Sequence, residues 1–311
     1  MALGLGLAVG ALAAVRDAAL AGTTIAARYA LRAGIALLGA RLTLGQVLET
    51  GAVSAVAIVI TMATALLLAT WFARRLDVRP PLSALVTVGM AICGNSAILA
   101  LAPIVRAPHR ETAYAVSTIT IFGLIAVLAL PIAGHLLGLT DATFGTWAGL
   151  AVNDTAQVVA TGFAYSPPAG EVATIVKLTR NLTILPVLLG ATWLAVRDRR
   201  GSADAPVATR GAPIGLIARA VPWFVVAFVG FAALRSIGAL DGAVPTGGTL
   251  ADLCSTAANL LILLALAGVG LATDVRAMLG VGHRPFLLGA AIWTVITFLA
   301  LGLSIAVTDI R

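Results

Sequence analysis

The chain has 311 residues, of which 60% are hydrophobic and 11% are charged, and its formal net charge is +7. Soluble domains carry about 25% charged residues, so this composition excludes a soluble enzyme or a soluble nucleic-acid-binding domain. Most arginines lie in short segments between apolar runs, where membrane topology accounts for a basic excess. We therefore expect an all-α, polytopic membrane protein with no enzymatic activity and no nucleic-acid partner.

The apolar runs predict about ten transmembrane helices, each near the length that crosses a bilayer. They lie at 2–15, 26–48, 52–71, 82–105, 112–137, 144–165, 171–196, 214–234, 253–272 and 286–307. The run at 2–15 lacks a basic leader and a cleavage site, so we interpret it as a short or truncated membrane segment. The loops are too short for a second domain, and residues 1–311 are expected to form one transporter domain.

Polar residues interrupt the run 82–105 near its centre. Cys93, Gly94, Asn95 and Ser96 lie there, where a crossing helix would have no water around it. Non-helical backbone at that depth is tolerated when it is buried in protein or lines a cavity, and transporters build substrate sites from such breaks. A small-residue patch for helix packing is the alternative.

A second copy of this pattern favours a shared site. A shift of 60 positions aligns residues 89–92 with 149–152 without a gap, and the polar residues Asn153, Asp154, Thr155 and Gln157 then follow. We therefore predict two broken helices that meet at mid-membrane, within a core at about 82–196.

A further similarity, between residues 37–42 and 266–271, relates the flanking helices at about 26–71 and 253–307. By the span count these two segments cross in opposite directions, as in an inverted repeat, whereas the copies 60 positions apart run parallel. A simple inverted duplication does not accommodate both similarities.

Ionisable residues within a membrane are costly and usually functional. Asp154 is a candidate for coupling to protons or ions, or else a carboxylate neutralised by a structural arginine. Lys177 and Arg180 share one helix face at i and i+3 and are candidates for binding an anion; the alternative is that they extend toward the membrane interface. Cys93 and Cys254 have no metal-ligand spacing, and the chain carries no phosphate loop or cofactor motif.

Several stretches resemble the YeiH-type family of sulfate exporters over nearly the whole chain. They are residues 34–42, 91–98 with 102–105, 122–123, 144–149, 156–160 and 176–180. The resemblance implies a multi-span carrier related to bile-acid symporter-like and cation/proton antiporter-like folds, built from inverted repeats with crossed, broken helices. In the relatives the position of Asn153 is often histidine, and an additional N-terminal span is present.

The leading hypothesis is a secondary transporter in the inner membrane of a bacterium that exports a small oxyanion, either sulfate or a sulfonate. The substrate would contact Cys93, Gly94, Asn95, Ser96, Asn153, Thr155, Gln157, Lys177 and Arg180, and Asp154 would couple transport to a proton or sodium ion. Two alternatives stay open: a cation/proton antiporter or sodium-coupled symporter that uses Asp154, and a membrane sensor or scaffold without transport. The sequence also leaves open whether the chain forms a homodimer.

Overall fold

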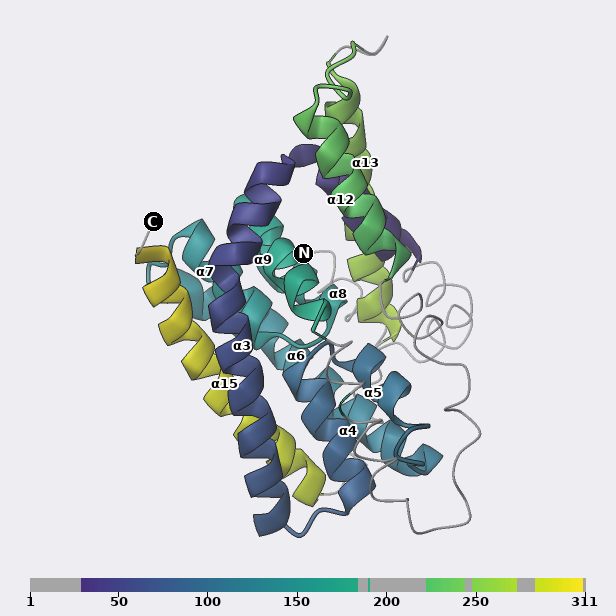
Figure 1. Ribbon diagram of the computed structural model, residues 1–311, viewed down its shortest axis with the longest axis vertical. Helices are drawn as coiled ribbons and strands as arrows, with labels where there is room; N and C mark the ends of the chain where they lie inside the picture. Colours follow the sequence, from purple (N-terminus) through teal and green to yellow (C-terminus); the bar gives the residue numbers. More distant parts are fainter. Residues whose placement is uncertain (1–28, 184–189, 191–221, 244–247, 273–282, 310–311) are drawn as a thin grey trace. The chain divides into compact units, whose positions relative to one another are not determined.

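The structure is a computed structural model that describes residues 29–183, 190, 222–243, 248–272 and 283–309 (Figure 1). After a helical segment at 29–38, the elements are η1 Gly39–Arg41, α3 Leu44–Arg75, α4 Pro80–Ala91, α5 Asn95–Leu101, α6 His109–Leu136, α7 Asp141–Ala151, α8 Thr155–Tyr165, α9 Pro167–Asn181, α12 Trp223–Ser236, α13 Leu250–Ala272 and α15 His283–Asp309. The predicted run at 2–15, the start of the run at 26–48, most of the second half of the run at 171–196 and the first part of the run at 214–234 lie outside the described residues.

Three helices in the described ranges are long and apolar enough to cross a membrane. They are α3, α6 and the part Phe286–Thr308 of α15, and shorter apolar helices lie at Pro80–Ala91, Trp223–Ser236 and Leu250–Ala265. This confirms the expectation of a helical membrane protein, whereas the total of about ten spans stays a prediction.

The predicted position of the border between the first two long helices was wrong. We expected helices at 26–48 and 52–71, but the interruption lies at η1 and α3 begins at Leu44. Thr43 and Gln46 cap this start reciprocally: the Thr43 N–H donates to Gln46 Oε1 at 2.9 Å, and the Gln46 N–H donates to Thr43 Oγ1 at 3.3 Å. This is the capping-box pattern, a signal present in the sequence.

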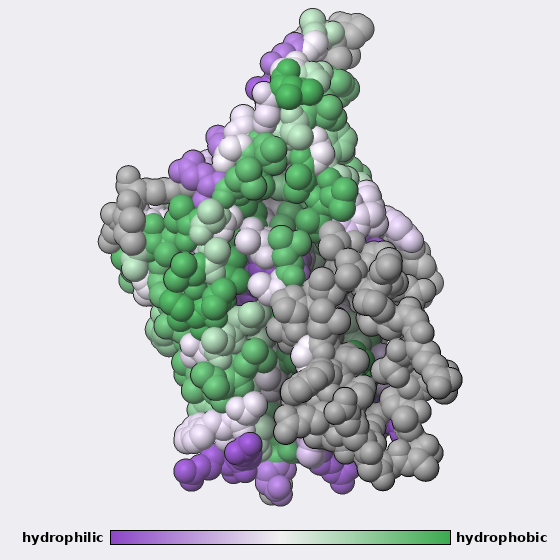
Figure 2. All heavy atoms as spheres, viewed as in Figure 1, coloured by the Kyte–Doolittle hydropathy of each residue, from purple (hydrophilic) through white to green (hydrophobic). Residues whose placement is uncertain are grey.

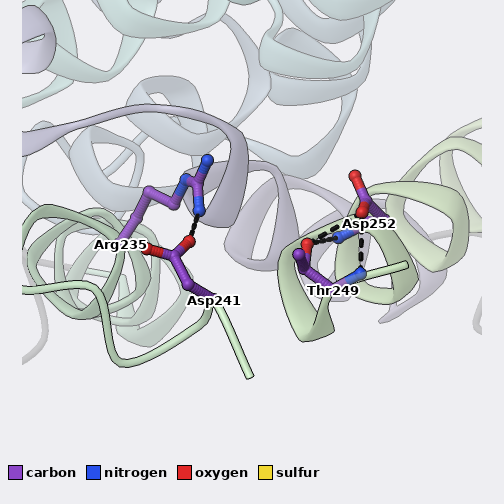
Figure 3. Close-up of polar contacts among 4 residues, drawn as sticks. All are labelled: Arg235, Asp241, Thr249 and Asp252. Carbon is purple, nitrogen blue, oxygen red and sulfur yellow. Dashed lines mark hydrogen bonds and ion pairs between the residues drawn. The ribbon is translucent and has the colours of Figure 1, made fainter. Parts of the chain in front are cut away.

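The chain divides into two compact units, Met1–Val53 with Pro222–Ala277 and Ser54–Val221 with Met278–Arg311. In the first unit η1 packs on α12 so closely that a Cβ atom on Gly39 would lie 2.1 Å from the Phe228 carbonyl oxygen. A second capping box opens α13, where the N–H and hydroxyl of Thr249 each donate to Asp252 Oδ2 at 2.8 Å, and an ion pair joins Arg235 to Asp241 (Figure 3). These contacts fix the ends of α12 and α13.

The second unit presents apolar side chains outward along α3. Val56, Leu67 and Trp71 are exposed there, and hydrophobic residues cover much of the face that α3 and α15 present in Figure 2. The hydrophilic lower end of that face agrees with Arg74 and Arg75 in the last turn of α3. Exposed apolar surface that ends at a group of arginines is what a lipid environment selects.

Helices α4 and α5 form a hairpin instead of one broken crossing helix. A Cβ atom on Gly89 would lie 3.0 Å from the Ile98 side chain, although nine helical residues would separate the two by about 13 Å along a straight axis. The chain therefore turns back at 92–94. Arg79, just before α4, lies 4.0 Å from Glu111 in the first turn of α6, so α6 starts beside the start of α4.

Helices α7 and α8 form a second hairpin with the same consequence. The Tyr165 hydroxyl at the end of α8 donates to the Leu139 carbonyl just before α7, and Ser166 Oγ lies 2.5 Å from Asp141 Oδ1. Phe144 stacks on Tyr165 with ring centroids 4.0 Å apart. Both ends of this hairpin thus lie at one level, and the predicted crossing helix at 144–165 is corrected to a helix that enters and returns.

The two hairpins start at opposite ends of α6 and meet near its middle. The first starts beside the N-terminal end of α6, and the second follows its C-terminal end after a short turn. At the turns, Gly94 lies against Ile119 and Gln157 Nε2 donates to the Thr120 carbonyl at 3.1 Å. The two copies that lie 60 positions apart therefore enter from opposite ends of α6 and do not run parallel. The conflict between the two internal similarities, which arose from counting each hairpin as a crossing helix, is thereby removed.

Helix α9 completes the second copy by packing along both arms of its hairpin. A Cβ atom on Gly145 would lie 2.7 Å from the Val172 side chain, and one on Gly149 would lie 2.7 Å from the Val176 side chain. Because both residue numbers rise together, α9 runs parallel to α7. Its C-terminal end, with Lys177 and Arg180, is thereby carried to the level of the hairpin turns.

Candidate functional site

The candidate site is the contact between the two hairpin turns, residues 92–94 and 152–154, which we call the tips. A Cβ atom on Gly94 would lie 3.3 Å from the Asp154 Cα and backbone nitrogen. Gly94 also has φ +62° and ψ −125°, a conformation that L side chains rarely adopt. Glycine is thus required here for its backbone and for the close approach of the second tip.

The second tip is fixed by its own polar side chains. Asp154 caps α8, since its Oδ1 accepts the Ala156 N–H at 2.9 Å. Asn153 is 2% exposed, and its Nδ2 donates to the Met90 sulfur on α4 at 3.1 Å. Both interruptions predicted from the sequence are present, and they are in contact.

Arg180 is fully buried and binds carbonyl groups of both hairpins. Nε and Nη2 donate to the Ala91 carbonyl at 3.1 and 2.8 Å, Nη2 donates to the Met90 carbonyl at 3.0 Å, and Nη1 donates to the Leu150 carbonyl at 2.5 Å. These carbonyls lie in the last turns of α4 and α7.

Lys177 is also 0% exposed, and it likewise binds one carbonyl of each hairpin, at the next residues along the two tips. Its Nζ donates to the Ile92 carbonyl at 2.9 Å and to the Val152 carbonyl at 3.1 Å. Ile92 and Val152 are equivalent under the shift of 60 positions, as are Met90 and Leu150. A single basic pair on α9 therefore binds corresponding carbonyls of both copies.

The physical reason lies in the helix ends. The last four carbonyls of a helix have no partner within it, and a buried carbonyl without a donor costs about 1–3 kcal/mol. At the end of α4 the Ile92 and Gly94 N–H groups satisfy Val88 and Gly89, and Arg180 and Lys177 satisfy the next three carbonyls. The two cations in turn lie at the negative ends of two helix dipoles, which stabilises buried positive charge.

This geometry changes how Lys177 and Arg180 can serve an anion. We expected Lys177 and Arg180 to bind an anion, but the guanidinium group of Arg180 binds backbone carbonyls instead. Both side chains are fully buried, and most of their N–H donors already bind backbone carbonyls, so they have little capacity left to bind a ligand directly. Their role in anion binding stays a prediction. In this structure they can attract an anion at a distance, through the electrostatic field of their positive charges.

The other predicted residues divide into an accessible set and a buried set. Ser96 is exposed, and Asn95, Asp154 and Thr155 are half-buried. Cys93 is buried inside the first tip. Gln157 is buried against α6, where a Cβ atom on Gly123 would lie 1.7 Å from its Oε1, so that residue links α8 to α6.

Sequence reasoning missed Met90 and Asn181. Met90 supplies the sulfur acceptor for Asn153, and Asn181 Nδ2 lies 3.4 Å from Thr155 Oγ1. Asn181 follows Arg180 directly and lies four residues after Lys177, so helical spacing could have placed it near the basic pair. Met90 carries no comparable signal, because an apolar residue within an apolar run looks like core.

Four amide oxygens around the tips are buried without a hydrogen-bond donor among the described residues. They belong to Asn95, Asn153, Gln157 and Asn181. Within the same residues, no three His, Cys, Asp or Glu side chains lie close enough together to hold a metal ion. The tips thus combine buried positive charge with unsatisfied acceptors.

Comparisons with known proteins agree on one family. The profile of the family described as Conserved hypothetical protein 698 matches residues 1–289. A UPF0324 membrane protein of Clostridium tetani is 34% identical over 268 residues, which cover 85% of this chain and 76% of the relative. UPF0324 membrane proteins of Streptococcus pyogenes serotype M6 and Geobacter sulfurreducens are 35% and 34% identical, over 94% and 88% of this chain and 84% and 82% of their own lengths. No solved structure matches.

Proposed function

Because the chain belongs to the UPF0324 family of membrane proteins, the family that its YeiH-type motifs indicated, we propose that it is a secondary transporter whose solute binds where the hairpin tips meet. The observation that supports this proposal most strongly is that two buried cations, Lys177 and Arg180, bind corresponding carbonyls of both tips. Helix ends that meet within a membrane are a general way to build a solute site.

In this proposal the tips lie near mid-membrane, and the hairpin–helix units α4–α6 and α7–α9 are inverted halves of a carrier of about ten spans. Three of the four hairpin arms, α4, α7 and α8, support that depth, whereas α5 is shorter with 7 residues. The 11 residues of α7 give about 16 Å, roughly half the thickness of the hydrocarbon core. The two hairpins enter from opposite ends of α6, as inverted halves require.

The proposed solute is a small oxyanion, either sulfate or a sulfonate. Two N-terminal helix ends and three C-terminal helix ends, counting that of α9, lie at the level of the tips, and at about half a unit each their partial charges sum to about −0.5. Lys177 and Arg180 then contribute two positive charges against the carboxylate of Asp154, so the tips carry about half a positive charge. At an effective dielectric constant of about 20, half a unit charge about 8 Å away contributes roughly 1 kcal/mol.

A second candidate is coupling to a proton or sodium ion through Asp154, in an antiporter or symporter. The observation that favours it is accessibility: Asp154 is half-buried, whereas Lys177 and Arg180 are fully buried. Coupling through Asp154 and transport of an anion are compatible, and the direction, taken as export across the inner membrane, follows the family resemblance.

Flux into proteoliposomes tests this proposal. Purified protein is reconstituted, and entry of ³⁵S-labelled sulfate and of a ³⁵S-labelled sulfonate is followed with and without imposed pH and sodium gradients. We expect entry of at least one anion to exceed that in protein-free vesicles and to respond to a gradient. Flux at the protein-free level for both anions under every gradient would contradict a transporter and would favour a sensor or scaffold.

A further inference from the structure

The unpaired hydrogen-bond acceptors at the tips allow an inference about the chemistry of the solute. This inference rests on the proposed function. Asn153 is the clearest case. A thioether sulfur can only accept a hydrogen bond, so the contact with Met90 orients the amide nitrogen toward the sulfur and leaves Oδ1 on the other side. That oxygen is buried and has no donor among the described residues.

Asn153 is not isolated. Asn95 directly follows Gly94 at the first tip, and Asn181 lies beside Thr155 at the start of α8. Both have a buried side-chain oxygen without a donor in the described part of the chain. Native proteins leave few buried polar atoms unpaired, because such an atom loses its hydrogen bonds to water without a replacement. Three such oxygens around one backbone contact indicate a partner that brings donors.

We propose that the solute is a small organic zwitterion, with an ammonium group at one end and a sulfonate or carboxylate group at the other. An ammonium group presents three N–H donors and complements the acceptor oxygens of Asn95, Asn153 and Asn181. A bare sulfate ion presents only acceptor oxygens, which these amide oxygens repel.

Different groups would bind the anionic end of such a solute. Ser96 and Thr155 offer hydroxyl donors on the accessible side of the tips, and the buried charges of Lys177 and Arg180 supply a positive field. The solute thus has one end for the acceptors and one end for the donors and field. Asn153, the most deeply buried of the three amides, is the residue that distinguishes such a zwitterion from a plain anion.

A bare metal cation at the same oxygens is the competing occupant. It would add a positive charge to tips that already carry Lys177 and Arg180, and like charges at short range are unfavourable in a protein interior. A zwitterion adds no net charge, and its two ends complement both kinds of group. The charge balance therefore favours the zwitterion.

Isothermal titration of the purified full-length protein, in choline chloride to exclude sodium, tests the proposal. The probes are taurine (2-aminoethanesulfonate), ethanesulfonate, which lacks the amine, and inorganic sulfate; sodium chloride is titrated separately. We expect taurine to bind at least about tenfold more tightly than ethanesulfonate, a difference of about 1.4 kcal/mol, because a charge-assisted hydrogen bond is stronger than a neutral one. Asn153→Leu should reduce that preference to less than about threefold, whereas Thr161→Val, a buried change on α8, should leave it intact.

The proposal is overturned if ethanesulfonate or sulfate binds as tightly as taurine, or if taurine does not bind. Saturable sodium binding that Asn153→Leu abolishes, without taurine binding, would assign the oxygens to a metal ion instead. Should Asn153→Leu fail to fold, the comparison of taurine with ethanesulfonate on the unmodified protein still decides. Sulfate flux in proteoliposomes without taurine binding would refute this inference and leave the transporter standing, whereas absence of all flux would refute the transporter itself.

Discussion

Gly94 lies so close to Asp154 that a Cβ atom on the glycine would be 3.3 Å from the aspartate's Cα and backbone nitrogen. The two residues are 60 positions apart and occupy equivalent places in the two hairpins. Their contact brings the two halves of the core together, and the basic pair on α9 holds the carbonyls on either side of it.

Replacing Gly94 by alanine should destabilise the protein for two separable reasons. One is the backbone conformation at φ +62° and ψ −125°, which lies outside the regions that L residues populate and costs about 1–3 kcal/mol, and the other is crowding against the second tip. Gly138 is the control for a positive φ, because it has φ +63° with nothing within 4 Å of an added Cβ atom. We expect Gly94→Ala to lower the melting temperature more than Gly138→Ala and to abolish flux, which Gly138→Ala should retain. Equal effects would show that the tips are not in close contact.

Substitutions of Arg180 should act on folding before they act on transport. Arg180→Ala removes the donors of the Met90, Ala91 and Leu150 carbonyls, and loss of one partner from a buried charged network costs about 3–5 kcal/mol. Arg180→Lys keeps the charge but cannot reach three carbonyls with a planar fork, so its loss should be smaller. Thermal unfolding of the three proteins should follow the order arginine, lysine, alanine. A fully stable Arg180→Ala variant would contradict the structural role.

Lys177→Met keeps the length of the side chain and removes its donors. The Ile92 and Val152 carbonyls then lose their partner, so the tips should open more often. Hydrogen exchange is expected to accelerate at residues 92–97 and 152–158, and not in the middle of α15. Thr174→Val is the control on the same helix, since the Thr174 hydroxyl donates to the Gly170 carbonyl of its own helix. If exchange at the tips is the same in both variants, Lys177 does not hold them.

Asp154 has two functions in this account, and one substitution separates them. Asparagine caps a helix about as well as aspartate, so Asp154→Asn should retain the start of α8 and the melting temperature while removing the charge. We expect its flux to lose dependence on the pH or sodium gradient. Asp154→Ala should lose the cap as well, at a cost of about 1 kcal/mol. Gradient-driven flux that is unchanged in Asp154→Asn would exclude this carboxylate as the coupling group.

The positions of the two breaks could be predicted from the sequence, but their geometry could not. Gly94, with its polar neighbours, and Asp154 interrupt apolar runs at matching places, and the shift of 60 positions relates them correctly. An apolar run of the length of 82–105 has the same composition whether the chain crosses or turns back. The contacts that distinguish the two, such as Tyr165 with Leu139, join residues 26 positions apart that no local pattern relates.

The partners of the basic pair could not be predicted either. Reasoning from the sequence pairs a buried cation with a carboxylate or an anion, because those charges are visible in the sequence. Arg180 and Lys177 instead bind backbone carbonyls, which every residue carries. Their need for donors arises only after the chain has turned at 92–94 and 152–154, so it is a property of the fold.

The central claim is that the hairpin tips line the path of the solute, and accessibility at Ser96 tests it most directly. In a variant with Cys93→Ala and Cys254→Ala, Ser96→Cys is treated in proteoliposomes with a charged, membrane-impermeant thiol reagent. Ile125→Cys is the control, since Ile125 is 40% exposed on α6 near the level of the tips and should face lipid. We predict that Ser96→Cys reacts, that taurine slows its reaction, and that Ile125→Cys stays unmodified. Equal labelling at both positions, or no labelling at Ser96→Cys, would contradict the account.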